Sequence, residues 1–143
     1  MSTREPGVNQ VIADILRGMR RRWKVQSEPG GAIRGGSKTP DILVSEAGAL
    51  PLIIENEFVP APGVEADATG RLGLRLADGG REIRAVIALR TPERARNVPQ
   101  SKLQAWLCAC PDFEYALHRR QRGDDDSRWT TSNWPPPHAS LKT

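Results

Sequence analysis

Two short apolar runs near the middle of the chain, separated by a turn-forming segment, place the strongest constraint on its fold. The first run covers residues 42–44 (ILV) and the second covers residues 50–54 (LPLII), with SEAG at positions 45–48 between them. Apolar runs of this length, bounded by turn residues, are typical of buried strands. The sequence therefore predicts an antiparallel hairpin that other elements must cover.

An amphipathic helix is predicted before this hairpin, over residues 7–21, because apolar residues recur there at the i, i+3, i+4, i+7 spacing. These positions are Val8, Val11, Ile12, Ile15, Leu16 and Met19. Residues 23–27 then alternate between apolar and polar and predict a first strand, which a glycine-rich loop links to the hairpin.

After the hairpin, the sequence predicts a second helix over 64–76, which Gly70 and Gly73 interrupt. It then predicts a buried strand over 83–89, which Pro92 ends. A short helix over 101–108 and a strand over 113–117 are optional additions. The predicted order is α-β-β-β-α-β, an α/β (α+β) arrangement in which helices flank a central mixed sheet.

Length and composition indicate one globular domain, which we place at residues 1–118. The charged, proline-rich segment 119–143 is expected to be disordered or to dock a partner, which Trp129 and Trp134 favour. The chain has no apolar run long enough to span a membrane and no signal peptide at its start, so we expect a cytoplasmic protein. Cys108 and Cys110 are expected to be reduced thiols.

The charge is unevenly distributed along the chain. Residues 1–40 hold 8 Lys+Arg and 3 Asp+Glu (net +5), residues 41–70 hold 0 and 6 (net −6), and residues 71–143 hold 13 and 8 (net +5). Basic flanks suit a polyanionic partner, and Arg20, Arg21, Arg22 and Lys24 form a basic cluster that can reach phosphate. The alternative is that the acidic residues and this cluster are ordinary solvated charges.

Asp41, Glu55 and Glu57 are the residues of the acidic segment best placed for chemistry. Glu55 and Glu57 share one face of the second hairpin strand, and antiparallel pairing brings Asp41 beside Glu55. Three converging carboxylates predict a site for a hard cation, Mg²⁺ or, by substitution, Mn²⁺. The alternative is that these residues are solvent-facing charges at the end of a hairpin.

The segment Pro40-Asp41, followed after 13 residues by Glu55-Asn56-Glu57, resembles the motif of the PD-(D/E)xK nuclease superfamily, whose restriction endonuclease-like core has the order α-β-β-β-α-β. The resemblance covers roughly residues 5–90. It implies that Asp41 and Glu55 are metal ligands in an endonuclease, most often of restriction or defence type, that hydrolyses DNA. Glu57 departs from the family pattern because it occupies the position of the usual lysine, and there it could ligate metal or take a proton from water.

The sequence holds no lysine between Lys38 and Lys102, so Arg71 and Arg75 are the nearest cations on the following helix, where they could clamp the nucleic-acid backbone. The missing lysine keeps a second interpretation open, a non-catalytic nucleic-acid-binding module or degenerate nuclease. A third interpretation is an interaction domain of a larger assembly, as a homodimer or with a methyltransferase or another restriction-modification subunit.

Overall fold

The structure is a computed structural model that describes residues 5–19, 22–36, 38–45, 51–109, 117–121 and 130–132. Its helices and strands, in chain order, are α1 (Glu5–Met19), β1 (Lys24–Ser27), β2 (Ile42–Ser45), β3 (Leu52–Phe58), α2 (Val64–Thr69), β4 (Ala85–Thr91), α3 (Gln100–Ala109), β5 (Leu117–Gln121) and β6 (Thr130–Ser132). Two short 3₁₀ helices, Arg34–Gly36 and Glu93–Asn97, lie in the connections. The elements from α1 to β4 follow the predicted order α-β-β-β-α-β.

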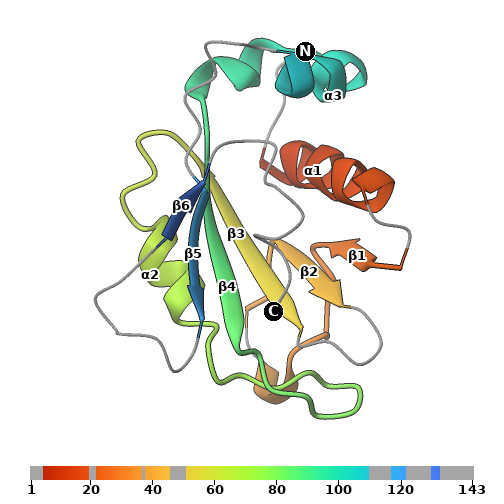
Figure 1. The fold of residues 1–143 in the computed structure, drawn as a ribbon, viewed down its shortest axis with the longest axis vertical. Helices are drawn as coiled ribbons and strands as arrows, with labels where there is room; N and C mark the ends of the chain where they lie inside the picture. Colours follow the sequence, from red (N-terminus) through yellow and green to blue (C-terminus); the bar gives the residue numbers. More distant parts are fainter. Residues whose placement is uncertain are drawn as a thin grey trace.

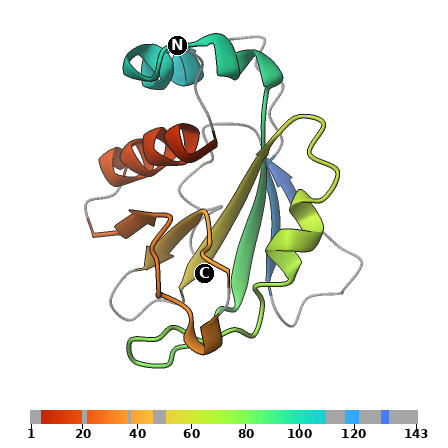
Figure 2. The same cartoon turned by 180° about the vertical axis from the view of Figure 1, so that it is seen from behind.

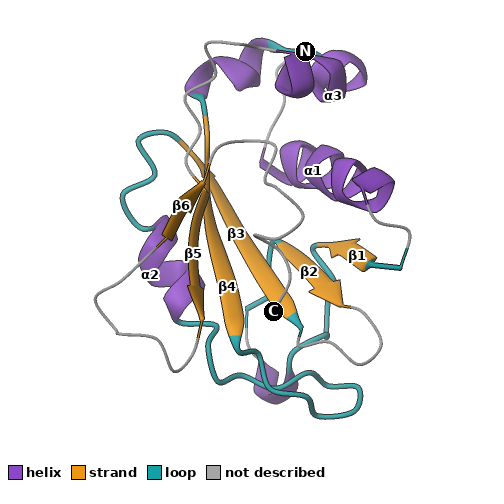
Figure 3. Cartoon of the chain, in the orientation of Figure 1, coloured by secondary structure: helices purple, strands orange, loops and turns teal. Residues whose placement is uncertain are grey.

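The strands form one mixed sheet in the order β1-β2-β3-β4-β5-β6 (Figure 1). The β3–β4 pair is parallel, and every other neighbouring pair is antiparallel. Parallel neighbours need a crossover connection, and the segment that carries α2 supplies it (Figure 3). The predicted hairpin is confirmed, since β2 and β3 pair with Ile42 opposite Ile54.

Strand alternation sorts the apolar side chains into two layers, one on each face of the sheet. Leu52 and Ile54 of β3 join the layer that packs against α1 and α3, whereas Ile53 joins the layer that packs against α2. The helices accordingly lie on opposite sides of the sheet (Figures 1 and 2). The chain is therefore a mixed α+β protein with helices on both sides of its sheet.

The first helix is close to its predicted position, and it also holds the edge of the sheet. Its apolar stripe is buried, and the guanidinium of Arg17 donates from Nε and Nη2 to the Val25 carbonyl oxygen, at 3.0 and 2.6 Å. Helix α1 thus contacts the sheet through apolar packing and through a polar link to β1.

The second helix is shorter than the predicted range 64–76, because it ends at Thr69 with Gly70 as its C-cap. Gly73 has a φ of 87°, a left-handed conformation that favours glycine and does not continue a helix. Arg75 lies beyond this turn, in an isolated antiparallel bridge with Glu82. Arg71, in the turn that follows Gly70, and Arg75 both lie beyond the helix, so the expectation that places them on it is wrong.

Strands β3 and β4 extend beyond the predicted ranges, to Phe58 and Thr91. They pair with each other along their whole length, from Leu52 opposite Ala85 to Phe58 opposite Thr91. This pairing places Glu55 and Glu57 inside a strand instead of at its end. Pro92 follows β4 directly, as predicted, and α3 confirms the helix expected over 101–108.

The C-terminal part of the sheet differs from the sequence prediction. The expected domain boundary after residue 118 falls inside β5, and Thr130–Ser132 pairs with β5 as strand β6. Most of the predicted strand 113–117, and Trp129 and Trp134, lie outside the described residues. Within the described ranges, no helix is long and apolar enough to cross a membrane.

Candidate active site

Asp41 and Glu55 lie next to each other across the β2–β3 pair. The register that sets Ile42 opposite Ile54 places Asp41, just before β2, opposite Glu55 in β3. The Asp41 backbone N–H donates to Glu55 Oε2 at 2.9 Å, and the Asn56 backbone N–H donates to Asp41 Oδ2 at 2.7 Å. Both carboxylates are thus held by backbone donors of the opposite segment, which fixes their relative position.

Arg71 forms a buried ion pair with Glu55. Its Nη2 lies 3.2 Å from Glu55 Oε1, and the two side chains are only 8% and 9% exposed. The same guanidinium donates to the backbone carbonyl oxygens of Thr39, at 3.2 Å, and of Lys38. Arg71 follows the last turn of α2, so it joins the α2 layer to the segment that leads into β2.

The electrostatic state of Glu55 reflects two opposing influences. Burial is the larger one, and it raises the pKa of the Glu55 carboxyl above its ordinary value of 4.5. The hydrogen bond from Asp41 N–H and the charge of Arg71 lower this pKa, while the negative charge of Asp67 raises it. Burial therefore disfavours the ionised form of Glu55, and a cation close to its carboxylate would stabilise that form.

A cavity of about 380 Å³ opens beside this ion pair. Its charged lining residues are Glu55, Arg71, Lys38 from the loop before β2, and Asp67 from α2. Ala66, Gly70 and Leu74 complete the lining. The cavity thus exposes one face of the Glu55–Arg71 pair to a ligand, with a lysine at its rim.

Sequence reasoning missed Lys38 and Asp67 as site residues. The motif places its lysine after the aspartate, at position 57 or on the following helix. Lys38 instead lies three residues before Asp41. Its position next to the Asp41 motif was the available signal. Asp67 gave no such signal, since only the packing of α2 against β3 and β4 brings it to the cavity.

Glu57 is placed differently from the other two carboxylates. It is paired in register with Arg90 of β4 and is absent from the cavity lining. The guanidinium of Arg90 also forms an ion pair with Glu65 of α2. Among the described residues, no three His, Cys, Asp or Glu side chains are grouped to hold a metal ion. The described residues therefore do not bring Glu57 together with Asp41 and Glu55: it lies beside Arg90, about 7 Å further along β3 than Glu55.

Asp41 and Glu55, which backbone hydrogen bonds hold next to each other, fit the chemistry of Mg²⁺. This ion takes oxygen ligands and is usually held by one or two carboxylates, with water and substrate phosphate completing its shell. Asp41 and Glu55 provide such a pair. Glu55 Oε1 already contacts Arg71, so a cation at Glu55 must compete with or displace that guanidinium.

The basic residues predicted to bind nucleic acid fall in three places. Arg20 and Arg21 lie outside the described residues, whereas Arg22 and Lys24 line a second pocket at the β1 edge of the sheet. Arg75 does not line the Glu55 cavity; its Nη1 donates to the Gly80 carbonyl oxygen at 2.9 Å. Of the members of this set that the structure describes, Arg71 is the one at the candidate site.

Comparison with protein-family models, with curated proteins and with solved structures gives no significant match to this chain. The geometry and chemistry of the residues around Asp41 and Glu55 are therefore what indicates a function for this chain.

Proposed function

We propose that the chain is a Mg²⁺-dependent nuclease of the PD-(D/E)xK superfamily that hydrolyses phosphodiester bonds in DNA. The observation that carries the proposal is the hydrogen-bonded approach of Asp41 and Glu55 across β2 and β3, beside a cavity that Glu55 lines together with Lys38 and Arg71; Asp41 is not a lining residue of this cavity. Asp41 and Glu55 are the two acidic positions of the motif, and they are adjacent in space although 14 residues apart in sequence. The α-β-β-β-α-β order and the mixed sheet support the same proposal.

Asp41 and Glu55 would hold the ion. When bound, Mg²⁺ supplies Lewis-acid stabilisation of phosphoryl oxygen and lowers the pKa of water. The hydrolysis adds water across one P–O ester bond, so that a hydroxyl remains on phosphorus and the departing ester oxygen takes up a proton. The role of the chain is to orient the phosphodiester and to stabilise the negative charge that grows on it.

Lys38 takes the electrostatic role that the motif assigns to a lysine at position 57. Its side chain lines the same cavity as Glu55, so its ammonium can approach a phosphate bound there. Arg71 would be a second group able to hold a phosphate oxygen if a cation took its place at Glu55. Glu57 is next to Arg90 and outside the cavity, so neither role depends on it.

A non-catalytic, degenerate nuclease domain is the second candidate function, and a specific contact favours it. The Arg71–Glu55 pair already offsets part of the charge of the buried carboxylate, and breaking a buried ion pair costs stability. If Arg71 stays in place, Glu55 is a structural residue and the cavity binds phosphate without cutting it.

A cleavage assay separates the two candidates. The purified chain is incubated with plasmid and single-stranded DNA in Mg²⁺, Mn²⁺ or EDTA, next to the variants Asp41→Asn and Glu55→Gln. Asp14→Asn and Glu93→Gln are matched controls, since they make the same chemical changes at exposed side chains. Circular dichroism verifies that each variant is folded.

We expect cleavage that requires the metal. It should persist in both control variants and be lost in Asp41→Asn and Glu55→Gln. DNA binding without cleavage in either metal would support the degenerate domain instead. Cleavage retained in folded Asp41→Asn would refute the assignment of this residue as a ligand.

A further inference from the structure

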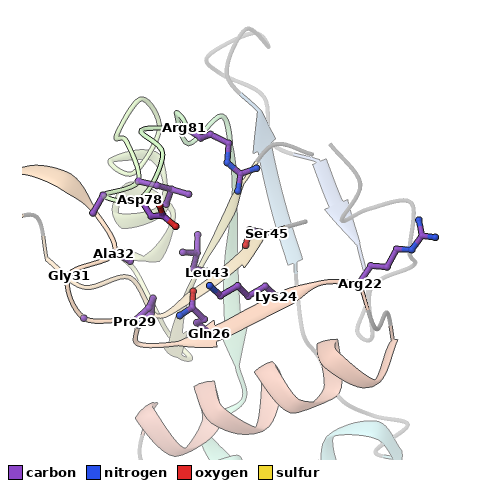
Figure 4. A pocket seen from close by; sticks show the side chains of 13 residues that line it. Arg22, Lys24, Gln26, Pro29, Gly31, Ala32, Leu43, Ser45, Asp78 and Arg81 are labelled. Atoms are coloured by element: carbon purple, nitrogen blue, oxygen red, sulfur yellow. The ribbon is translucent and has the colours of Figure 1, made fainter. Parts of the chain in front are cut away.

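A second pocket, of about 600 Å³, lies at the β1 edge of the sheet. Its sheet side carries Lys24 and Gln26 of β1 with Leu43 and Ser45 of β2, and its opposite wall is the segment 76–81 (Figure 4). The alternation of β1 buries Val25 under α1 and directs Lys24 and Gln26 to the other face. This edge of the α2-side face therefore carries polar side chains where the centre of the sheet carries apolar ones.

The charged lining of this pocket is mainly positive. Arg22, Lys24 and Arg81 contribute cations, and Asp78 is the acidic lining residue. In Figure 4, Arg81 extends from its loop toward the sheet, while Lys24 lies along the sheet opposite it. Leu43 and Leu76 add apolar side chains to the lining. An anion with an attached organic part fits such a lining, because cations hold the charge and the apolar side chains contact the remainder.

The wall that carries Arg81 is held in a defined position. Leu76 N–H donates to the Arg81 carbonyl oxygen at 2.9 Å, and Ala77 N–H donates to the Ala32 carbonyl oxygen at 2.7 Å. Gly80 has a φ of 68°, and a Cβ built there would approach the Arg34 guanidinium to 2.7 Å. The turn is thus tied to the loop that packs beside it, so the position of Arg81 is set before any ligand arrives.

The pocket and the Glu55 cavity lie on the same face of the sheet, and one segment of the chain contributes to both linings. Leu74 lines the cavity and Leu76, two residues later, lines the pocket. Lys24 lies two strands away from Glu55, which is about 10 Å across the sheet. Along the strand direction, the registers place it four residues away, which is about 13 Å. A nucleic-acid strand bound at the cavity can therefore reach the pocket within a few nucleotides.

We propose that this pocket is an auxiliary phosphate site, in which Lys24 and Arg81 hold a backbone phosphate of a DNA strand that extends from the Glu55 cavity. The ligand identity rests on the proposed function. The contact does not depend on base sequence, because ammonium and guanidinium groups that bind phosphate do not touch the edges of the bases. Described residues of the lining include no aromatic ring for stacking, which favours the sugar–phosphate backbone over a base.

The test measures binding separately from cleavage. A fluorescent single-stranded DNA of about 16 nucleotides is titrated by anisotropy with Glu55→Gln protein in EDTA. The same titration is then made with Lys24→Gln, Arg81→Gln and the double substitution in that background. Lys24→Arg and Arg81→Lys keep the charge, and Lys102→Gln is the matched control because Lys102 is an exposed lysine on α3, against the other face of the sheet.

The double substitution is expected to weaken binding about tenfold or more, while the charge-preserving variants and Lys102→Gln stay close to the parent. The slope of log K against log salt should fall in magnitude by roughly 0.7 for each phosphate that is no longer neutralised. If the double variant binds DNA with the same affinity and the same salt dependence as Lys102→Gln, the proposed phosphate site is wrong.

The two proposals fail separately. A chain that binds DNA through Lys24 and Arg81 but cuts nothing in Mg²⁺ keeps the auxiliary site and loses the nuclease. A chain that cuts DNA with unchanged affinity in the double variant keeps the nuclease and loses the auxiliary site.

Discussion

At the scale of single residues, Asn56 connects the candidate site to the core beneath it. Its backbone N–H holds Asp41 Oδ2, while its side-chain Nδ2 donates to Asn9 Oδ1 of α1 at 3.1 Å. The hydroxyl of Thr91 in β4 donates to Asn56 Oδ1 at 2.7 Å. These three polar side chains are buried, so the residue between the two motif glutamates has a structural task that its variable position in the motif does not reveal.

Removing Asn9 should therefore destabilise the fold. Asn9→Ala leaves the buried Asn56 amide without its acceptor, which costs about 1–3 kcal/mol of unfolding free energy. Urea denaturation measures this loss, and Asn97→Ala, a change at an exposed asparagine, is the control. A difference below about 0.5 kcal/mol, the usual effect of a surface substitution, would show that the network does not stabilise the protein.

Glu55 should make stability depend on pH in a direction opposite to that of most carboxylates. Because burial raises its folded-state pKa, folding favours the protonated form. The stabilising contribution is complete below the unfolded pKa of about 4.5 and is lost as pH rises through the folded-state pKa. Arg71 and the Asp41 N–H reduce this loss, and Asp67 increases it.

The variant Glu55→Gln isolates this contribution, because glutamine does not titrate. In EDTA, the unfolding free energy of the parent minus that of the variant should decrease as pH rises from about 4 to about 8. Denaturant unfolding across this range measures the difference. A constant difference would mean that Glu55 titrates alike in the folded and unfolded chain.

At the scale of elements, edge strand β1 depends on α1 through Arg17. The guanidinium donates two hydrogen bonds to the Val25 carbonyl oxygen, in addition to the apolar packing of the helix. Arg17→Met keeps most of the aliphatic stem and removes both bonds, at a cost of about 1 kcal/mol. Faster amide exchange over 24–27, with β3 and β4 protected as before, is the expected outcome. The exposed Arg84 supplies the control Arg84→Met, and equal exchange in the two variants would disprove the link.

The elements that the sequence predicts well are those with a complete local signal. Helix α1 has its apolar stripe, and the hairpin has two apolar runs with turn residues between them. Strand β6 has no such signal, because its three residues are Thr-Thr-Ser and only pairing with β5 makes them a strand. Likewise, no local pattern in β3 reveals that β4 pairs with it along its whole length.

The candidate site divides in the same way. The nearness of Asp41 and Glu55 follows from alternation and hairpin register, both readable from the sequence. The positions of Lys38, Asp67 and Arg71 depend on how α2 and the loop before β2 pack against the sheet. Alternation predicts that Glu57 lies on the same face as Glu55. The neighbours of the two residues differ, however, because Glu57 is opposite Arg90 of β4 and Glu55 is opposite Ala88.

At the scale of the whole molecule, the last two strands complete the sheet beyond β4. Strand β4 is almost wholly buried and apolar, and it pairs with β3 on one side and with β5 on the other. The β5–β6 pair is thus part of the same sheet as the candidate site. Without it, the backbone donors and acceptors of β4 would form an open edge, which is a template for pairing with another chain.

A chain that ends at residue 116 should accordingly lose solubility or self-associate. Analytical ultracentrifugation should show concentration-dependent mass, and thermal unfolding should begin at lower temperature than in the full chain. The matched control ends at residue 132 and keeps β5 and β6, so it should remain as stable as the full chain and keep its mass. A monomeric, equally stable 1–116 chain would show that β4 needs no neighbour, and the domain would then end before β5. If both truncated chains associate, residues 133–143 are what protects the sheet, and the protection comes from outside the β5–β6 pair.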